Sequence, residues 1–213
     1  AYRRQRQMCI RDSLSTLDTT TLELLRKLQS IPALCKTRLV GDTALALQIG
    51  HRKSIDLDFF GKIEVEKDEL VIALEQIGAL TVLKESPRIH IYLLNNVKID
   101  IVDYQYSWVD DVVVKQGIRM ASLKDIAAMK VTAIIGRGTK KDFVDIAFLL
   151  RYFSMNDILD FYSQKYPDGS IFMAMKSLAY FDDAEEDIMP YMLTDITSVS
   201  YTHLRAHETS AHL

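Results

Sequence analysis

The sequence predicts an α+β fold, in which a mixed β-sheet with flanking helices is followed by a C-terminal helical bundle. Short β-favouring runs alternate with helical patterns up to Ala121, and from Ser122 onward only helical periodicities follow. A chain of 213 residues, 48% of them apolar, is long enough for one substantial core or two small subdomains. We therefore expect an α/β core over 14–121 and a helical subdomain over 122–199.

The expected core begins with a helix and a strand–turn–helix unit. Leucines at helical spacing predict a helix over 16–30, which Pro32 ends. A β-favouring run at 37–40 leads into Gly41, and a stretch of small residues at 43–49 predicts the second helix.

The next expected strand carries acidic side chains on one face. Over 54–60 the sequence SIDLDFF alternates with a period of two residues, which is typical of a strand with one buried face. We expect Ile55, Leu57 and Phe59 on one face of the strand. The opposite face then carries Ser54, Asp56 and Asp58.

A helix and a meander complete the expected sheet. Leucines and isoleucine at helical spacing predict a helix over 67–77. Asn95-Asn96 tolerates positive φ and predicts a tight hairpin between two of the following strands. The expected extended segments are 79–85, 88–94, 97–104 and 112–115.

Helical patterns fill the second half of the chain. Ser122 is a candidate N-cap at the boundary between the sheet and the helices. The expected helices are 123–135, 141–153, 155–164 and 170–180.

Both ends of the chain look foreign to this fold. Segments 1–13 and 200–213 resemble peptides translated from sequencing-adapter DNA, and we expect them to be non-native extensions. The first carries four Arg and one Asp and the last is neutral, so the chain's net charge of −3 becomes −6 between them. An acidic body argues against nucleic-acid binding through its bulk field.

The composition favours a cytoplasmic protein. Two cysteines offer no disulfide framework, and Cys35 is expected to be a small core residue. Apolar runs fall short of the roughly 18 residues that a membrane-spanning helix needs, so no membrane partner is expected.

Three carboxylates are candidate metal ligands. Asp56 and Asp58 lie on one strand face, where like charges repel unless a cation lies between them. Asp100 has the parity to join them from the strand 97–104, whereas Asp103 lies on the opposite face. One or two Mg²⁺ ions suit such carboxylates together with phosphate oxygens. The alternative is a surface strand with solvated acids.

The turn at Gly41 is a candidate phosphate site. Gly41 permits close backbone approach, and the amides that open the following helix favour an anion. The turn alone is weak support, but with Asp56 and Asp58 about fifteen residues further on it becomes specific.

Two stretches resemble a known family. LVGDTALALQIGHRKSIDLDFFG at 39–61 and MKVTAIIGRGTKKDFVDIAFLL at 129–150 resemble the characteristic blocks of the AbiEii/AbiGii toxin family of nucleotidyltransferases. The resemblance implies a nucleotidyltransferase-like fold, Mg²⁺ dependence, an NTP substrate, a cognate antitoxin, and a role in a toxin–antitoxin or abortive-infection system.

The resemblance also implies roles for individual residues. Asp56 and Asp58 would bind metal, and Lys130 would contact the triphosphate; Asp100 joins the metal ligands on strand parity and not on the resemblance. Asp142 and Asp145 would complete the catalytic set from the helical half. The expected nucleotide-binding residues are Gly41, Asp42, Thr43, Arg52, Ser54 and Lys130. Asp42 departs from the family pattern of Gly or Ser and places a negative charge where a phosphate should approach.

Several of these residues have simpler interpretations. Lys130 could be a surface lysine with its stem along the helix, and Asp142 and Asp145 could favour the helix dipole. The basic run at 51–53 could meet phosphate or an RNA backbone, or form an exposed loop.

The predicted function is transfer of a nucleoside monophosphate from an NTP to an RNA, such as a tRNA end, or to a protein. Asp100 is the candidate that helps to deprotonate the acceptor hydroxyl. One alternative is a phosphatase with Asp56 as nucleophile, which Phe60 and the unexplained Gly41 turn disfavour. The other is a catalytically silent NTP-binding or partner-docking module, for which Asp42 is the best argument.

Overall fold

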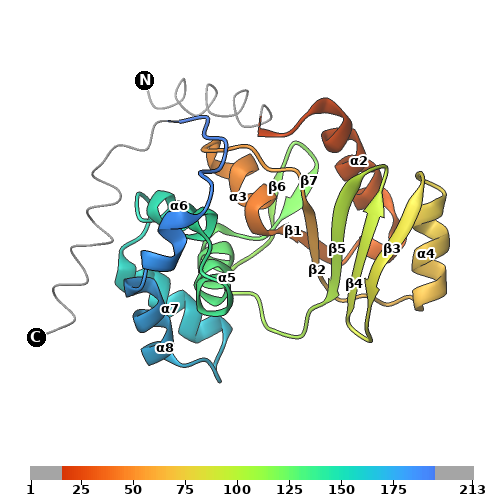
Figure 1. Cartoon of the computed structure of the whole chain (residues 1–213). Coiled ribbons are helices and arrows are strands. Elements are labelled where there is room, and N and C mark those ends of the chain that lie inside the picture. Colours follow the sequence, from red (N-terminus) through yellow and green to blue (C-terminus); the bar gives the residue numbers. More distant parts are fainter. Residues whose placement is uncertain (1–15, 195–213) are drawn as a thin grey trace, which may run out of the picture. The chain divides into compact units, whose positions relative to one another are not determined.

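The fold is that of a computed structural model, shown in Figure 1, which describes residues 16–194. The chain divides into two compact units. Within the described residues, one comprises 16–106 together with Asp111–Ala121, and the other comprises Ser107–Asp110 and 122–194. The segments 1–13 and 200–213, expected to be non-native, lie outside the described residues.

A seven-stranded mixed sheet forms the centre of the first unit, in the order β3-β4-β5-β2-β1-β7-β6. The pairs β1/β7 and β2/β5 are parallel, and the other neighbours are antiparallel. The strands are β1 (Thr37–Val40), β2 (Leu57–Gly61), β3 (Leu80–Glu85), β4 (Ile89–Leu94), β5 (Val97–Asp103), β6 (Val113–Lys115) and β7 (Ile118–Met120). The α+β class is confirmed.

Helices flank this sheet. Figure 1 labels α2 (Thr19–Ser30), α3 (Gly41–Ile49) and α4 (Lys67–Glu75), and a short 3₁₀ turn, η2 (Pro32–Leu34), follows α2. Helix α3 packs on β1 and β2, and α2 packs on β7. Gln29 of α2 fixes β7 by accepting from the backbone N–H of Arg119 and donating to its carbonyl, both at 2.8 Å.

The β4–β5 hairpin has the turn that the sequence predicts. Asn95 and Asn96 adopt φ of 50° and 66°, in the left-handed region that asparagine tolerates. The Asn95 side chain also accepts from the backbone N–H of Ala79 at 3.0 Å, which ties the turn to the start of β3. The turn predicted from Asn95-Asn96 is therefore the one that joins β4 and β5.

Three expectations about the first unit are wrong. Strand β2 begins at Leu57, and the side chain of Ile55 is 66% exposed, because the segment before β2 is held by side-chain contacts and not by the strand ladder. Strand β7 was not expected; it follows a tight turn in which Gln116 and Gly117 have φ of 52° and 79°. Cys35 is exposed and is not a core residue.

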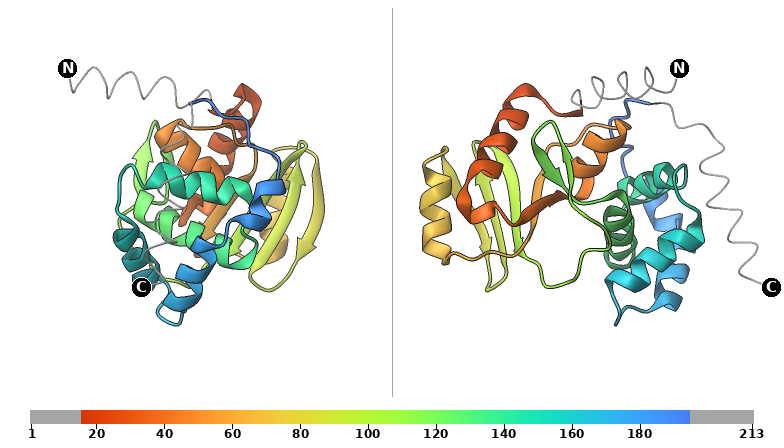
Figure 2. Two further views of the ribbon diagram at one scale, coloured as in Figure 1. Left: turned by 60° about the vertical axis from the view of Figure 1, so that its left-hand side comes forward. Right: turned by 180° about the vertical axis from the view of Figure 1, so that it is seen from behind.

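The second unit is the expected helical bundle, seen from two further sides in Figure 2. Its central helix, α5, packs against the other three. Ser122 caps α5 by accepting from the backbone N–H of Asp125 at 3.1 Å, and Ser154 and Asp157 form a capping box on α7. The elements are α5 (Leu123–Gly136), α6 (Lys140–Leu149), α7 (Met155–Lys165), α8 (Ile171–Ala179) and η3 (Asp182–Glu186).

Among residues 16–194 no helix combines the length and the apolar character that crossing a membrane requires.

Candidate active site

Gly41 forms the junction between β1 and α3. Its φ of +67° lies in the left-handed region, where glycine is not strained. A Cβ atom at this position would lie 2.5 Å from Oδ2 of Asp58. The glycine is therefore required twice, once for the backbone turn and once for the close approach of Asp58.

Asp58 and Asp100 lie directly opposite each other in the parallel register of β2 and β5. Their strand neighbours, among them Leu57 and Ile99, are fully buried on the other face of the sheet. The alternation therefore places both carboxylates on one face, as the sequence predicts. Directly opposed residues have Cβ atoms about 5 Å apart, so two like charges there are unfavourable without a cation.

The electrostatics of Asp58 reflect this crowding. Burial, followed by the negative charges of Asp100, Asp42 and Asp56, raises the pKa of Asp58 to about 7, while Lys98 opposes the shift. The structure thus brings four carboxylates of the first unit within electrostatic reach. Carboxylate oxygens are ligands that Mg²⁺ prefers.

The expected trio of ligands is not closely assembled. Among the described residues, no choice of one oxygen each from Asp56, Asp58 and Asp100 brings all three within 4.8 Å of one another. Lys98, which the sequence did not single out, lies with Nζ 2.7 Å from Oδ1 of Asp100. Its ammonium group neutralises part of the negative charge at this face.

A hydroxyl network fixes the backbone of Asp56. The side chain of Thr43 is buried, and its Oγ1 donates to the carbonyl oxygen of Asp56 and lies 2.8 Å from Oγ of Ser54. Because a hydroxyl carries one proton, Ser54 is the donor in the second contact. Both side chains, expected to bind nucleotide, therefore contact the protein and position the residues that precede β2.

Arg52 and Asp42 form an ion pair beside the Gly41 turn. The side chain of Arg52 is only 3% exposed, and its Nη2 lies 3.0 Å from Oδ2 of Asp42 in the first turn of α3. His51 is also fully buried, whereas Lys53 is exposed. The exposed-loop alternative is therefore wrong for His51 and Arg52. Asp42 is the residue that departs from the family pattern, and Arg52 neutralises its charge.

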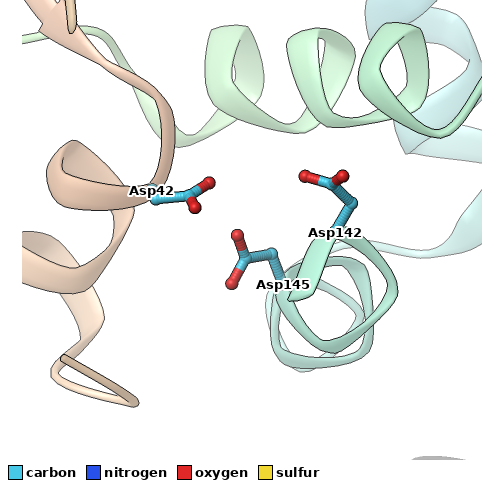
Figure 3. A group of neighbouring side chains, drawn as sticks. All are labelled: Asp42, Asp142 and Asp145. Carbon is cyan, nitrogen blue, oxygen red and sulfur yellow. The ribbon is translucent and has the colours of Figure 1, made fainter. Parts of the chain in front are cut away.

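In the second unit, Lys130 of α5 binds two carboxylates of α6. Its Nζ lies 3.0 Å from Oδ1 of Asp142 and 2.5 Å from Oδ2 of Asp145. Figure 3 shows these two acidic side chains leaving α6 toward the same side. All three residues are buried, so the surface-lysine alternative is wrong. The anionic partner that the buried lysine requires is provided by α6.

Asp142 is also held by the loop between α5 and α6. Burial alone would raise its pKa, but hydrogen bonds from Arg137, the charge of Lys130 and the hydroxyl of Thr139 outweigh burial and hold the pKa below its usual value. Arg137 donates through Nε at 2.9 Å and through Nη2 at 3.0 Å. Asp142 therefore stays ionised at neutral pH.

A second buried ion pair of this unit was not expected. Nζ of Lys165 lies 2.8 Å from Oδ1 of Asp125, with both side chains fully buried. Asp125 also accepts from the backbone N–H of Val109 at 2.8 Å, and Lys165 lies over the ring of Trp108. These contacts explain why Ser107–Asp110 belongs to the helical unit. Sequence spacing cannot reveal a pair 40 positions apart.

Comparisons with known proteins agree with this arrangement. A family model described as nucleotidyl transferase AbiEii toxin, type IV toxin–antitoxin system, matches residues 23–187. An uncharacterized protein of Aquifex aeolicus (strain VF5), aq_aa25, is 35% identical over 179 residues, which cover 79% of this chain and 87% of that protein.

Two solved structures share the fold. A candidate nucleotidyltransferase from Helicobacter pylori matches with a TM-score of 0.55 and 20% identity, covering 94% of both chains. ANT(2″)-Ia in complex with adenylyl-2″-tobramycin matches with a TM-score of 0.53 and 14% identity, covering 71% of this chain and 99% of that chain. The family match extends over most of the chain and includes every residue of the candidate site. The chain therefore belongs to the AbiEii family of nucleotidyl transferase toxins of type IV toxin–antitoxin systems.

Proposed function

We propose that this nucleotidyltransferase transfers a nucleoside monophosphate from an NTP to a hydroxyl of an RNA, such as a tRNA end, or of a protein. The observation that carries the proposal is the direct pairing of Asp58 with Asp100 beside the Gly41 turn. In this proposal residues 14–121 form the catalytic core and residues 122–199 a helical subdomain. Family membership favours this reaction over the phosphatase and the silent binding module.

The carboxylates of the first unit are the proposed Mg²⁺ ligands, and binding one ion would require their oxygens to move closer together than in this structure. Asp58, Asp100 and Asp56 offer the hard oxygen donors that Mg²⁺ prefers, and burial together with the neighbouring negative charges raises the pKa of Asp58. When bound, Mg²⁺ would polarise the phosphate oxygens and lower the pKa of the acceptor hydroxyl. Lys98, now beside Asp100, would then be released to pair with phosphate.

The start of α3 is the proposed phosphate site. The N-cap residue Val40 makes no side-chain cap hydrogen bond, and backbone N–H groups at the start of a helix favour an anion. Gly41 keeps the turn open, and the Arg52–Asp42 pair reduces the repulsion that Asp42 alone would exert on a phosphate. The nucleotide would thus be held mainly by backbone groups.

Asp100 is the proposed proton acceptor. The acceptor hydroxyl oxygen attacks the α-phosphorus, the bond to pyrophosphate breaks, and the proton passes to the carboxylate of Asp100. Thr43 and Ser54 position Asp56 through its backbone, and their contact with the nucleotide stays a prediction.

The helical unit contributes a second proposed set of residues. Lys130, Asp142 and Asp145 form one buried network, which we propose supports activity by holding α5 and α6 together. Contact of Lys130 with a triphosphate remains a prediction.

Biological partners follow from the family. A type IV toxin–antitoxin family implies an antitoxin and an NTP substrate. We propose in addition a cytoplasmic location and a role in abortive infection.

Label transfer tests the proposal. The chain is incubated with Mg²⁺, each α-labelled or γ-labelled NTP, total bacterial RNA and lysate protein. We expect α-label to appear on one acceptor class and to vanish with Asp58→Asn, while Asp68→Asn, an exposed aspartate of α4, retains activity. Release of γ-label as free phosphate without α-label transfer would support a phosphatase. A folded protein that gives neither would refute both enzymatic proposals.

A further inference from the structure

We propose that a second pocket of the first unit, remote in sequence from the Gly41 turn, binds a guanidinium group carried on an aliphatic stem. The pocket has a volume of about 500 Å³ and is separate from the residues assigned to nucleotidyl transfer. Its walls come from the segment before α4, the start of α4, the β3–β4 turn and the end of β5. The lining residues used in the argument are Ile63, Leu70, Glu66, Glu85, His90 and Asp103.

His90 provides an unsatisfied buried polar atom in this pocket. Its side chain is only 7% exposed, and within the described part of the chain its Nδ1 has no hydrogen-bond partner. Buried polar atoms are normally paired, and leaving one unpaired is unfavourable. The proposal assigns this nitrogen the unprotonated form, in which it accepts a hydrogen bond from a ligand that donates.

Sheet register places acidic groups around His90. His90 of β4 lies opposite Glu85 of β3 and Ile101 of β5, and Asp103, two positions after Ile101, shares that face. Glu85 is already paired, with Nζ of Lys67 at 2.5 Å. Within residues 16–194, Asp103 accepts hydrogen bonds from uncharged groups, the backbone N–H of Ile63 at 3.3 Å and the side chain of Gln105 at 2.9 Å, and it also interacts electrostatically with the exposed Lys62.

The charge balance of the pocket favours a cation. Three carboxylates, those of Glu66, Glu85 and Asp103, face one lysine, Lys67. An anion is therefore repelled, even though the start of α4 carries no side-chain cap. The remaining walls, including Ile63, Val65 and Leu70, are apolar and suit an aliphatic stem.

A metal ion does not fit this arrangement. In the described residues, no three ligand atoms of the pocket's histidine and carboxylates lie within 4.8 Å of one another. The acceptors are spread over a wider span, which a planar guanidinium with five N–H donors can serve better than a single ion or a compact ammonium. Such a group occurs in free guanidinium compounds and in arginine side chains.

Calorimetry and histidine NMR test the proposal on the full chain. Agmatine is the free probe, a short unstructured peptide with one central arginine is the peptide probe, and inorganic phosphate is the anionic control. We expect saturable agmatine binding that moves the ¹⁵N shift of His90 Nδ1. Asp103→Asn should weaken binding about tenfold or more, because it removes a charge-assisted hydrogen bond.

Matched variants separate this pocket from other effects. Glu69→Gln, an exposed carboxylate of α4 outside the pocket, should bind agmatine within about twofold of the unchanged chain, as expected for surface charges. Asp58→Asn should also leave agmatine binding unchanged, so the result does not depend on the transferase proposal. Tighter binding of the peptide would assign the site to a polypeptide arginine, and tighter binding of agmatine to a free compound.

Three results would overturn the assignment. The first is the absence of saturable binding of agmatine or peptide at concentrations up to about 10 mM, because a dissociation constant above that value does not indicate a specific site. The second is agmatine binding that does not change the ¹⁵N shift of His90 Nδ1. Because this measurement uses the unsubstituted chain, a folding defect of a variant cannot explain it. The third is an Asp103→Asn variant that is folded by circular dichroism and binds as tightly as the unchanged chain.

Discussion

Oδ2 of Asp58 lies close to the position that a Cβ atom on Gly41 would occupy, so the Gly41 turn packs directly against the acidic strand β2. A Cβ on Gly41 would meet that oxygen at 2.5 Å. The Gly41 turn and the proposed metal ligand Asp58 are therefore adjacent in space, although the rest of α3 separates them in the sequence. Both lie within residues 23–187, which match the AbiEii family model.

Gly41→Ala should abolish nucleotidyl transfer. The substitution strains a backbone with φ of +67° and also displaces Asp58. Gly117→Ala is the matched control, because φ is +79° there but nothing lies within 4 Å of the added methyl group. Both variants should lose about 1–2 kcal/mol of unfolding free energy from the left-handed backbone. Only Gly41→Ala should lose label transfer. Equal label transfer by the two variants would show that Gly41 is not part of the active site.

Mg²⁺ binding should be coupled to proton release around neutral pH. Burial and the neighbouring carboxylates raise the pKa of Asp58 to about 7, and a metal ligand must be ionised. The apparent affinity for Mg²⁺ should therefore rise as the pH increases through about 7, and flatten above it. Asp58→Asn should remove this pH dependence. Calorimetry in buffers of different ionisation enthalpy measures the protons released, and a pH-independent affinity would contradict the assignment.

The same shift predicts the pH dependence of stability without metal. A carboxyl whose folded pKa lies above its unfolded value binds protons more tightly in the folded state. Between the usual aspartate pKa of 3.8 and about 7, the unfolding free energy should therefore fall as pH rises. Denaturant titrations should show that Asp58→Asn reduces this fall, whereas Asp68→Asn does not.

Periodicity and turn chemistry predicted the parts of the site that are local in sequence. Alternation along 54–60 and 97–104 was sufficient to place Asp58 and Asp100 on one face, because strand geometry has a period of two. It failed at Ile55, where the backbone before β2 is held by the hydroxyl of Thr43. A side-chain contact from α3 overrode the pattern of the segment itself.

Ion pairs between residues on different elements could not be predicted from the sequence. The sequence left Lys130 with two interpretations, contact with a triphosphate or a surface position, because its actual partners depend on how α5 and α6 pack. The Lys165–Asp125 pair gave no signal, since each residue is unremarkable in its own helix. Lys98 was overlooked because a lysine at the start of a strand is usually solvated.

Lys130→Met should strongly destabilise the chain. It leaves Asp142 and Asp145 buried with less counter-charge, and breaking a buried pair by removing one partner costs about 3–5 kcal/mol. Lys176→Met, an exposed lysine of α8, is the matched control and should change stability by less than about 0.5 kcal/mol. Chemical denaturation measures both values. A loss at Lys130 no larger than at Lys176 would mean that Arg137 alone is sufficient to stabilise Asp142.

Arg52→Gln should weaken NTP binding through Asp42. Without the guanidinium group, the carboxylate of Asp42 in the first turn of α3 is no longer neutralised and repels the triphosphate. We expect the KM for NTP to rise about tenfold, which corresponds to roughly 1.4 kcal/mol, with a smaller change in kcat. Adding Asp42→Asn to Arg52→Gln should recover most of the loss, because the repulsive charge is then removed. A double variant as impaired as Arg52→Gln would show instead that Arg52 itself contacts the nucleotide.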